Sequence, residues 1–470
     1  MKLPFKRGDV LSGLPITDLT AEGHGIARLD RAVVFVEGAV PGDVVDALVR
    51  KTRKNYGEAV VQNLVSSSPD RTDPLCTHFG TCGGCKMQHI NYSRQLMIKQ
   101  KAVIDAFERI GKLEFPETEP ILGSASQYEY RNRLDFAASD KRWLTTEEIA
   151  SGAPLQEPAL GFHIPGRFDK ILDVDRCHLQ EDLSNRIRNF IRTFAIENGW
   201  EFFHPVTQEG FLRNVIIRST STGEWMVIVV FRSEDALKQT ALLEKLKQEF
   251  PEITSLLYII NGKRNDTIFD QEVHCFSGRD HILEQMEGLT FKISAKSFYQ
   301  TNSAQAYELY KIVRDYAALT GTENVYDLYT GTGTIAQFVA RHAKRVAGID
   351  YIEDAIRDAA ENAQRNGIRN VHFEAGDLKD TLTEEFMARH GKPDVVITDP
   401  PRAGMHPDVT ERLLKLEPKR IVYVSCNPTT QARDIQNLSG SYSVRRLRPV
   451  DMFPNTMHVE SVALLELKQS

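Results

Sequence analysis

Residues 324–333, NVYDLYTGTG, decide the fold of the last part of the chain. A short apolar run is followed at once by a turn with two glycines, Gly331 and Gly333, and then by a helical pattern. This order predicts a strand, a tight turn whose backbone can approach a ligand, and a helix. Asp350 ends the next predicted strand, about twenty residues further on, where a carboxylate can bind both hydroxyls of a ribose. The spacing Gly331-x-Gly333-x-x-Ala336 also fits a dinucleotide fingerprint, so the kind of nucleotide stays open.

Apolar runs and helical patterns alternate from about Lys292 to the end of the chain. The predicted strands are 324–328, 346–349, 371–374, 395–398, 421–425 and 461–467. This alternation predicts a parallel sheet with helices on both faces. Ligands of such sheets bind at the carboxyl ends of the strands.

Three chemically active side chains stand at the ends of these strands. Asp399 is followed by two prolines, which predicts either a rigid lip that holds a planar base beside a methyl donor or a simple capped turn. Cys426 precedes Asn427-Pro428 and a predicted helix, whose N-terminus would lower the pKa of the thiol from about 8.5 and favour a nucleophilic thiolate. Glu460 opens the last strand and can reach the same cleft as a general base.

The first part of the chain, from about Gly8 to Leu64, contains short apolar runs separated by turn residues. We predict strands at 32–36, 44–49 and 58–64, in a small β-barrel of the OB type. The basic run 50–54 and Tyr56 can hold RNA phosphates and stack a base. A solvated hairpin tip is the alternative interpretation of the same residues.

Three cysteines are close together in the sequence, in a C-x5-C-x2-C pattern: Cys76, Cys82 and Cys85. Such a cluster in a reducing compartment indicates a metal site rather than disulfides. Cys177 is the candidate for a fourth ligand. Four thiolates suit either a [4Fe–4S] cluster or Zn²⁺, and the spacing does not distinguish them.

The region between the barrel and the C-terminal sheet has a mixed pattern. We predict helices at 92–110, 182–198 and 233–250, strands at 214–218, 225–231 and 255–260, and an exposed polar insertion at 141–158. These elements predict an α+β domain. The expected organisation is therefore multidomain, with boundaries at 1–68, 69–292 and 293–470.

Length and charge limit the class of protein. A chain of 470 residues has room for about two to four domains. The net charge of −6 excludes a small, globally basic nucleic-acid binder, although not an enzyme with a local basic surface. The chain shows neither a signal-peptide pattern nor an apolar run of about 20 residues, so we expect a soluble, cytoplasmic protein without a membrane partner. We expect it to be a monomer.

Taken together and in this order, the motifs resemble the RNA uracil-5-methyltransferase family, whose members make 5-methyluridine in RNA with S-adenosylmethionine. The matching stretches are 23–43 (the RNA-binding TRAM domain), 76–89 with Cys177, 130–133, 297–302, 399–402, 425–428 and 452–460. The resemblance implies an OB-like TRAM barrel, a central α+β domain with a [4Fe–4S] cluster, and a C-terminal α/β Rossmann-like methyltransferase domain.

The resemblance also implies roles for single residues. It makes Cys426 the nucleophile and Glu460 the general base. The residues that it assigns to the cofactor are Gln300, Tyr329, Thr334, Asp350, Asp377 and Asp399, and those that it assigns to the cluster are Cys76, Cys82, Cys85 and Cys177.

Relatives that carry both a TRAM domain and the cysteines more often act on large-subunit ribosomal RNA, so the expected substrate is 23S-type rRNA, with tRNA as the alternative. A rival from another class is an NAD-dependent iron–sulfur oxidoreductase. It accounts for the glycine turn and the cysteines, but leaves the strand ends at Asp399 and Cys426 unexplained. A non-catalytic RNA-binding module is a third reading, and it leaves most of the chain without a role.

Overall fold

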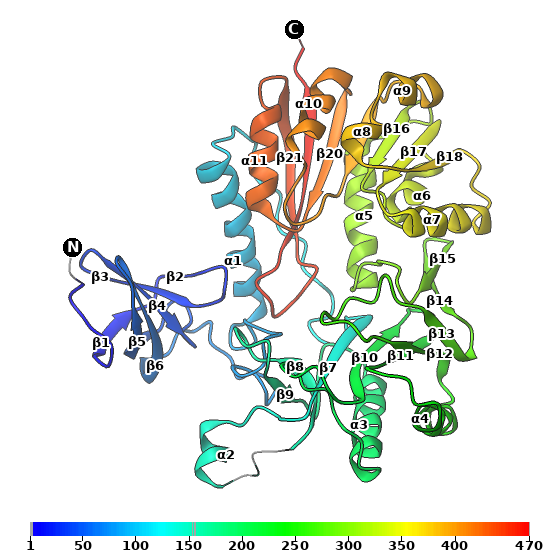
Figure 1. Cartoon of the computed structure of the whole chain (residues 1–470). Coiled ribbons are helices and arrows are strands. Elements are labelled where there is room, and N and C mark those ends of the chain that lie inside the picture. The colour runs from blue at the N-terminus through cyan, green and yellow to red at the C-terminus, as the bar shows by residue number, and fades with distance from the viewer. Residues whose placement is uncertain (1–2, 153, 155–156, 470) are drawn as a thin grey trace. The chain divides into compact units, whose positions relative to one another are not determined.

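The computed structural model describes residues 3–152, 154 and 157–469 (Figure 1). The chain forms two compact units. The first comprises Met1–Lys101 with Phe453–His458, and the second comprises Ala102–Met452 with Val459–Ser470. The division of the chain into three domains stays a prediction.

The first unit contains a six-stranded sheet with the order β1-β5-β6-β4-β3-β2. Its strands are β1 (Val10–Pro15), β2 (Asp18–Leu19), β3 (Gly25–Leu29), β4 (Ala32–Glu37), β5 (Val44–Thr52) and β6 (Tyr56–Ser66). Alternate residues point into one apolar core, for example Val34 and Val36 in β4 and Val45 and Ala47 in β5. This alternation is the pattern of strands with one buried face. The three strands predicted in this region are confirmed.

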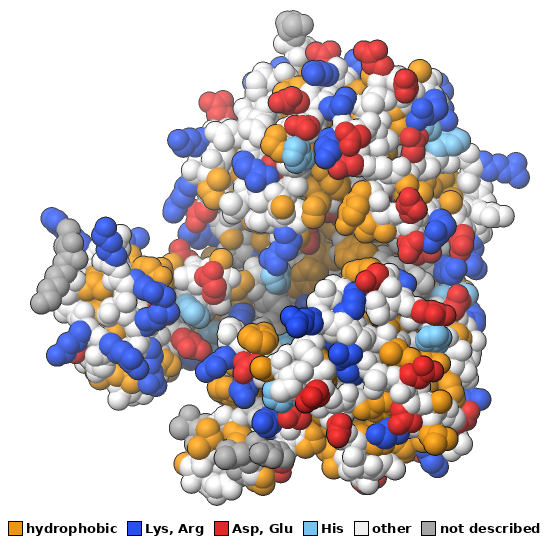
Figure 2. Space-filling model, viewed as in Figure 1, with side chains coloured by type: hydrophobic (Ala, Val, Ile, Leu, Met, Phe, Trp, Pro, Cys, Tyr) orange, Lys and Arg blue, Asp and Glu red, His pale blue; other side chains and the backbone are white. Residues whose placement is uncertain are grey.

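The outer surface of this sheet is basic. Figure 2 shows Lys and Arg side chains gathered on its visible face. The exposed basic residues of its strands and turns include Arg28, Arg31, Arg50, Lys51, Arg53 and Lys54. The chain then continues through the cysteine segment into α1 (Tyr92–Asp105) and a π-helical segment (Ala106–Ile110), which together form the helix predicted at 92–110.

The second unit begins with a seven-stranded sheet, β13-β12-β11-β10-β7-β8-β9, and a separate hairpin, β14-β15. The strands are β7 (Arg133–Ser139), β8 (Ala159–His163), β9 (Ile171–Asp173), β10 (Leu212–Ser219), β11 (Trp225–Phe231), β12 (Ile253–Ile260), β13 (Val273–Gly278), β14 (His281–Met286) and β15 (Leu289–Ser294). The helices are α2 (Thr146–Ala150), α3 (Asp182–Glu197) and α4 (Ala236–Glu249). The predicted α+β pattern is present. The polar insertion expected at 141–158 contains α2, and residues 153, 155 and 156 of it lie outside the described residues.

A second seven-stranded sheet follows, with the order β18-β17-β16-β19-β20-β22-β21. Its strands are β16 (Asn324–Leu328), β17 (Arg345–Asp350), β18 (Val371–Ala375), β19 (Val395–Thr398), β20 (Arg420–Ser425), β21 (Tyr442–Val450) and β22 (Glu460–Leu467). Its helices are α5 (Ser303–Ala317), α6 (Thr334–Ala340), α7 (Glu353–Arg365), α8 (Leu378–Thr381), α9 (Glu384–His390), α10 (Pro407–Leu416) and α11 (Pro428–Leu438). The strand–helix alternation predicted from the sequence is confirmed.

Burial shows that this C-terminal sheet is covered on both faces. Tyr326 and Leu328 pack in the core cluster that also holds residues of α8–α11. Their neighbours in β16, Val325 and Asp327, point to the opposite face and are equally buried. Successive side chains of a strand alternate between faces, so burial of every residue requires a layer on each side.

The expectation of an entirely parallel sheet is wrong at one edge. β22 runs antiparallel to β20, and β21 runs antiparallel to β22. The chain turns back directly from β21 into β22 without a crossover helix, and such a connection makes neighbouring strands antiparallel. β21 was not predicted from the sequence, because Arg445, Arg446 and Arg448 interrupt its apolar pattern, as charged residues often do in edge strands.

Among the described residues, no helix is both long and apolar enough to cross a membrane.

Candidate active site

The turn between β16 and α6 has the tight geometry that its glycines predict. Gly331 and Gly333 adopt φ angles of +54° and +74°, a region that is strained for other residues. A side chain at Gly333 would also collide with Phe373, whose Cζ lies 2.6 Å from the position of a Cβ. At Gly331, in contrast, nothing lies within 4 Å of that position. The backbone of Gly331 therefore faces open space that a ligand can enter.

Asp350 ends β17 and holds the same turn in place. Its Oδ2 accepts a hydrogen bond from the N–H of Gly331 at 2.9 Å, and its Oδ1 accepts one from Ile352 at 3.0 Å. Each carboxylate oxygen has a further lone pair, so the carboxylate can still bind the two hydroxyls of a ribose. The parallel register, which pairs Leu328 with Ile349, brings the two strand ends together.

Exposed apolar side chains flank this turn. Tyr351 and Ile352, directly after Asp350, are 73% and 40% exposed, and Phe298 is 67% exposed. The hydroxyl of Thr332 donates to the carbonyl oxygen of Phe298 at 3.4 Å, so this residue also lies beside the turn. Exposed apolar groups that gather at one place mark a binding surface. They suit a planar, partly apolar group such as adenine.

Asp327 adds a buried carboxylate beneath the turn. Its Oδ2 accepts hydrogen bonds from the Thr330 hydroxyl at 2.6 Å and from the N–H of Ala336 at 3.0 Å. Burial raises the pKa of Asp327 to about 7, and the nearby carboxylate of Asp350 also raises it. Asp327 was not among the predicted site residues, although a carboxylate inside an apolar strand just before a glycine turn is a usable signal.

Cys426 and Glu460 reach the same edge of the sheet through the register of two neighbouring strands. The antiparallel pairing of β20 and β22 places Ser425 opposite Ser461. Cys426 follows Ser425 in the chain and Glu460 precedes Ser461. In an antiparallel pair these two residues are therefore opposite each other, next to the Ser425–Ser461 pair. Glu460 is buried, and Cys426 is half-buried. Only the antiparallel direction of β22 allows this arrangement.

The side chain of Gln431, in α11, fixes this register. It is fully buried, and its Nε2 donates to the carbonyl oxygens of Tyr423 at 2.8 Å and Ser461 at 3.2 Å. Its Oε1 accepts a hydrogen bond from the Ser461 hydroxyl at 2.6 Å. One side chain thus binds both of the strands that position Cys426 and Glu460.

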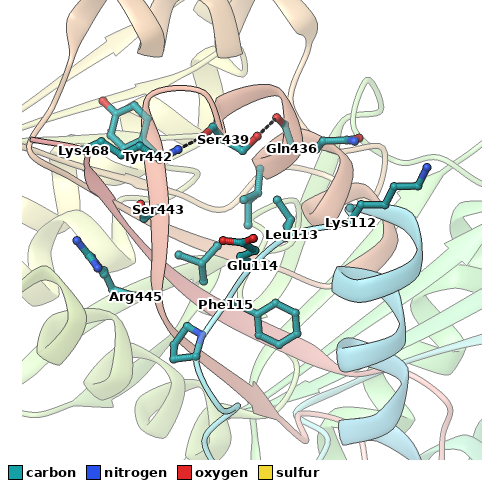
Figure 3. A pocket seen from close by; sticks show the side chains of 14 residues that line it. Lys112, Leu113, Glu114, Phe115, Gln436, Ser439, Tyr442, Ser443, Arg445 and Lys468 are labelled. Atoms are coloured by element: carbon teal, nitrogen blue, oxygen red, sulfur yellow. Dashed lines mark hydrogen bonds between the residues drawn. The ribbon is translucent and has the colours of Figure 1, made fainter. Parts of the chain in front are cut away.

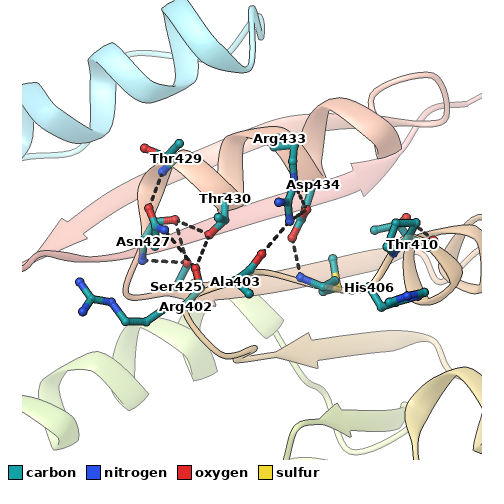
Figure 4. A network of polar contacts seen from close by, with 12 residues as sticks. Arg402, Ala403, His406, Thr410, Ser425, Asn427, Thr429, Thr430, Arg433 and Asp434 are labelled. Atoms are coloured by element: carbon teal, nitrogen blue, oxygen red, sulfur yellow. Dashed lines mark hydrogen bonds and ion pairs between the residues drawn. The ribbon is translucent and has the colours of Figure 1, made fainter.

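The loop after Asp399 is tied to the start of α11 (Figure 4). Asn427 caps the helix, with its Oδ1 accepting from the N–H of Thr429 at 3.1 Å. Its Nδ2 donates to the carbonyl oxygen of Arg402 at 3.0 Å, and the Thr430 hydroxyl donates to the same oxygen at 3.2 Å. These bonds hold the Asp-Pro-Pro-Arg segment beside the loop that carries Cys426.

Carboxylates dominate the electrostatics of this edge. Burial and the nearby Asp327 raise the pKa of Asp399 to about 7. Burial and Asp399 together raise the pKa of Glu460 well above its ordinary value, and the Arg402 guanidinium offsets part of this rise. The three carboxyl groups therefore oppose one another's ionisation.

The same cluster corrects the expectation for Cys426. Burial, followed by Glu460 and Asp399, raises the pKa of its thiol to about 11, and Arg402 offsets part of this rise. The expected lowering by the helix N-terminus does not prevail, because a half-buried thiol between two carboxylates gains more from staying neutral. The free enzyme therefore holds Cys426 as a thiol at neutral pH.

Three other predicted residues have different surroundings. Gln300 lies just before α5, and its carbonyl oxygen accepts a hydrogen bond at 2.9 Å from Nδ2 of Asn132. Thr334 begins α6 and shares a hydrogen bond of 3.2 Å with the hydroxyl of Tyr310. Asp377 is exposed, caps α8 and lies 3.3 Å from Nζ of Lys379, which together with the N–H of that residue holds the pKa of Asp377 below its usual range.

Tyr329 and Tyr310 complete the surroundings. Tyr329 adopts a positive φ of +61° directly before the glycine turn. Burial raises its pKa to about 12, although the N–H of His406 donates to its hydroxyl. Tyr310, in α5, is buried near Asp399 and Asp327, and burial followed by these carboxylates raises its pKa. The sequence gives no functional signal for Tyr310, because an aromatic residue at that helical position is typical of a core.

The four cysteines of the predicted metal site are divided between the two units. Cys76, Cys82 and Cys85 belong to the first unit, and Cys177 belongs to the second. Cys177 is buried, with its backbone N–H and carbonyl bound by the side chain of Asn185 at 2.8 and 3.1 Å. Within the described parts of the chain, no group of three or more His, Cys, Asp or Glu side chains is arranged to hold a metal ion. The four-cysteine cluster therefore stays a proposal of the resemblance, since spacing along the chain does not fix where the thiolates lie in space.

A separate pocket of about 700 Å³ lies on the second unit between residues 111–116, the end of α11 and β21 (Figure 3). Lys112, Glu114, Arg445 and Lys468 give it a mixed charge, and Leu113 and Phe115 line it with apolar surface. It contains none of the predicted site residues, so its size does not mark the active site.

The glycine turn, the carboxylate at the second strand and the covering of both sheet faces define a Rossmann-like nucleotide-binding enzyme. A family model described as tRNA (Uracil-5-)-methyltransferase matches residues 217–468, and one described as TRAM domain matches residues 14–61.

Relatives cover nearly the whole chain. A protein of Bacteroides thetaiotaomicron described as an uncharacterized RNA methyltransferase is 57% identical, over 96% of this chain and 100% of that protein. One from Chlorobaculum tepidum with the same description is 40% identical, over 99% and 98%. The crystal structure of Pyrococcus abyssi tRNA (uracil-54, C5)-methyltransferase in complex with S-adenosyl-L-homocysteine matches with a TM-score of 0.73 and 29% identity, over 97% of this chain and 100% of that chain.

These matches show that the chain belongs to the RNA uracil-5-methyltransferase family, and it is an S-adenosylmethionine-dependent RNA methyltransferase with an N-terminal TRAM domain. The rival reading as an NAD-dependent oxidoreductase is thereby wrong, because the glycine turn that suggested it belongs to a methyltransferase domain.

Proposed function

We propose that this enzyme transfers a methyl group from S-adenosylmethionine to C5 of a specific uridine in RNA through a covalent bond between Cys426 and C6 of the uracil. The observation that carries the proposal is the meeting of Cys426, Glu460 and Asp399 at one strand edge, beside the glycine turn. A nucleophile, a base and a nucleotide-binding turn within one edge are the groups that this reaction needs.

The proposed cofactor site is supported by the open backbone of Gly331, by the Asp350 carboxylate bound to its N–H, and by the exposed Tyr351 and Phe298. S-adenosylmethionine supplies an electrophilic methyl group on a sulfonium cation. A cation beside Asp399 lowers the pKa of Cys426, because it offsets the carboxylates that keep the thiol neutral. Cofactor binding thus favours the thiolate that the free enzyme suppresses.

The chemical steps use Cys426 first. Its thiol loses a proton to solvent, and the sulfur forms a bond to C6, which moves the electron pair of the C5–C6 double bond towards C5 and O4. C5 then bonds to the methyl carbon, the bond from that carbon to the sulfonium sulfur breaks, and S-adenosylhomocysteine is left.

Glu460 completes the reaction. It accepts the proton from C5, the electron pair of the C5–H bond re-forms the C5–C6 double bond, and the S–C6 bond breaks. The raised pKa of Glu460 makes its ionised form a stronger base, and the positive charge of bound S-adenosylmethionine would favour that ionised form.

The TRAM sheet is proposed to hold the RNA. Exposed basic side chains follow its strands. The rings of Phe35 and Tyr56 lie 5.1 Å apart, and Tyr56 comes shortly after the basic run 50–54 in the sequence. Lys and Arg bind phosphates, whereas aromatic rings stack bases of single-stranded segments. The target base has to leave its stack to reach Cys426.

Large-subunit ribosomal RNA is the proposed substrate, on the resemblance given by the TRAM domain and the cysteines. tRNA is the second candidate, which the match to the Pyrococcus abyssi tRNA enzyme over 97% of the chain favours.

The resemblance also implies a [4Fe–4S] cluster at the four cysteines, and none of the proposed chemical steps uses it. Iron and acid-labile sulfide measured in anaerobically purified protein test it, with neither element found as the result against it.

A trapping experiment tests the function. The enzyme is incubated with S-adenosylmethionine and with 5-fluorouridine-substituted 23S RNA or tRNA, and run on a denaturing gel. Fluorine at C5 does not leave as a proton does, so the covalent intermediate persists. We expect a cofactor-dependent shifted band with wild type and none with C426A, and sequencing of the bound RNA identifies the substrate. Methylated RNA without any trapped band contradicts the covalent route.

A further inference from the structure

Asn132 lies in the motif Tyr130-Arg131-Asn132-Arg133, which matches the family but has no role implied by the resemblance. It is 8% exposed and directly precedes β7. Its backbone N–H donates to the carbonyl oxygen of Thr301 at 2.8 Å, and its own carbonyl oxygen accepts from the N–H of Ser219 at 2.9 Å. The backbone of Asn132 therefore connects the end of β10 with the segment that leads into α5.

The side chain of Asn132 makes two further hydrogen bonds to that segment. Its Nδ2 donates to the carbonyl oxygen of Gln300 at 2.9 Å and to the hydroxyl of Ser303 at 2.8 Å. The hydroxyl of Ser303 in turn donates to Oε2 of Glu284 at 2.6 Å, and Glu284 is fully buried. Both amide hydrogens are thus used, and the direction of every bond in the chain is fixed.

A second side chain holds the other end of the same segment. Arg218, at the end of β10, is 2% exposed, and its Nη1 donates to the carbonyl oxygens of Ser294 and Ser297 at 2.9 Å each. Residues 298–300 lie between these two points of attachment. Thr332, in the glycine turn, contacts these residues, because its hydroxyl donates to the carbonyl oxygen of Phe298.

We propose that Asn132 is a positioning residue for the cofactor, which acts by holding residues 298–300 against the glycine turn. The inference rests on the proposed function, since it assumes that Gln300 and Phe298 face bound S-adenosylmethionine. Asparagine suits this position, because it presents two donors in one plane to two acceptors. Aspartate has the same shape but would place a carboxylate against the carbonyl oxygen of Gln300.

The test compares Asn132→Asp with wild type in the full-length protein, with S-adenosylhomocysteine as the probe in isothermal titration calorimetry. We expect its Kd to rise about ten-fold, because the hydrogen bond to the Gln300 carbonyl oxygen is lost and a carboxylate against that oxygen displaces the segment. The KM for S-adenosylmethionine rises by a similar factor, whereas kcat at saturating cofactor and the Kd for RNA change by less than about three-fold. This split between KM and kcat separates positioning from general damage.

Asn261→Asp is the matched control. Asn261 is also fully buried, and its Nδ2 donates to the carbonyl oxygens of Asn265 and Thr267 at 3.2 and 3.3 Å, in a turn remote in sequence from the cofactor segment. We expect a similar fall in melting temperature but an unchanged Kd for S-adenosylhomocysteine.

Ser303→Ala keeps the proposal testable if Asn132→Asp does not fold. It removes one acceptor of Asn132 but keeps the bond to Gln300, so we expect a Kd increase of about two- to three-fold. An unchanged Kd in Asn132→Asp, or in Ser303→Ala where only that variant folds, overturns the inference. If wild type itself does not bind S-adenosylhomocysteine, the proposed function fails instead.

Discussion

Buried carboxyl groups at the two ends of the C-terminal sheet have pKa values that are shifted in opposite directions. At the amino ends of the strands, Glu323 is buried, and its oxygens accept hydrogen bonds from the N–H and the hydroxyl of Thr320, both at 2.8 Å, and from the N–H of Thr322 at 3.2 Å. Burial acts to raise the pKa of Glu323, but these donors hold it below its usual range. At the carboxyl ends, burial and Asp399 raise the pKa of Glu460.

This difference shows where the enzyme tolerates unfavourable electrostatics. A carboxylate that receives several hydrogen bonds stabilises the fold in its ionised form. Carboxyl groups that face one another do not, and such groups cluster at functional sites because a bound ligand can relieve the repulsion. A cationic cofactor is the kind of ligand that the carboxyl ends favour.

Removal of the proposed nucleophile, Cys426, has the largest expected effect on activity at the carboxyl ends of the strands. We expect C426A to lower turnover by at least about a thousand-fold, because the covalent route is lost. The Kd for S-adenosylhomocysteine changes by less than about two-fold, since the glycine turn and Asp350 are untouched. Transfer of labelled methyl groups to RNA and calorimetry measure the two quantities. Full activity of this variant excludes the covalent mechanism.

Glu460→Gln has the next largest expected effect. Turnover falls by about 10²–10⁴-fold, the usual contribution of a general base. The covalent protein–RNA adduct accumulates with unmodified RNA, because Cys426 still adds to C6 but the C5 proton stays. A denaturing gel shows the adduct, and wild type, which completes the elimination, is the control without accumulation. Absence of the adduct removes Glu460 as the base.

Asp399→Asn sharpens the comparison through the thiol. The Asp399 carboxylate is one of the groups that raise the pKa of Cys426 to about 11, so its removal lowers that pKa. We expect the pH profile of Cys426 alkylation by iodoacetamide, followed by mass spectrometry of its peptide, to move to lower pH. An unchanged profile means that Asp399 does not act on the thiol.

The same variant, Asp399→Asn, tests how the stability of the fold depends on pH. Asp399 has a pKa of about 7 in the folded chain and about 3.9 when unfolded, so its ionisation disfavours the fold increasingly as the pH rises from 4 to 7. Asp399→Asn is therefore expected to raise the melting temperature at pH 8 more than at pH 5. Calorimetric scans at the two pH values measure the difference, and an equal shift contradicts the raised pKa.

Glu323→Gln has the smallest expected effect. It lowers the stability of the fold, whereas Asp399→Asn raises it. It removes part of a satisfied hydrogen-bond set, so we expect a loss of about 1 kcal/mol of stability at pH 7 with unchanged activity. The pKa of Glu323 is lowered, so its contribution is present above about pH 4.3 and is lost as the pH falls through the folded pKa. Urea unfolding at pH 7 and pH 4 measures this loss, and activity below wild type would show that the amino ends take part in function.

Much of the fold was predictable because local patterns carry it. The glycine turn, the strands on each side of it and the barrel strands depend on apolar periodicity and backbone freedom within a few residues. β21 was missed, because its arginines hide the apolar pattern. The four-cysteine site stays a prediction, because spacing along the chain does not fix where the thiolates lie in space.

The sequence by itself determined that Asp350, Asp399 and Cys426 stand at strand ends, and that the motifs follow the order of one family. Only the tertiary structure decided that β22 runs antiparallel and so brings Glu460 beside Cys426. It also decided that the thiol is held neutral and that Asn132 holds Gln300. The physical reason is that electrostatic and hydrogen-bond energies depend on distances between strands and loops, which no local pattern of residues specifies.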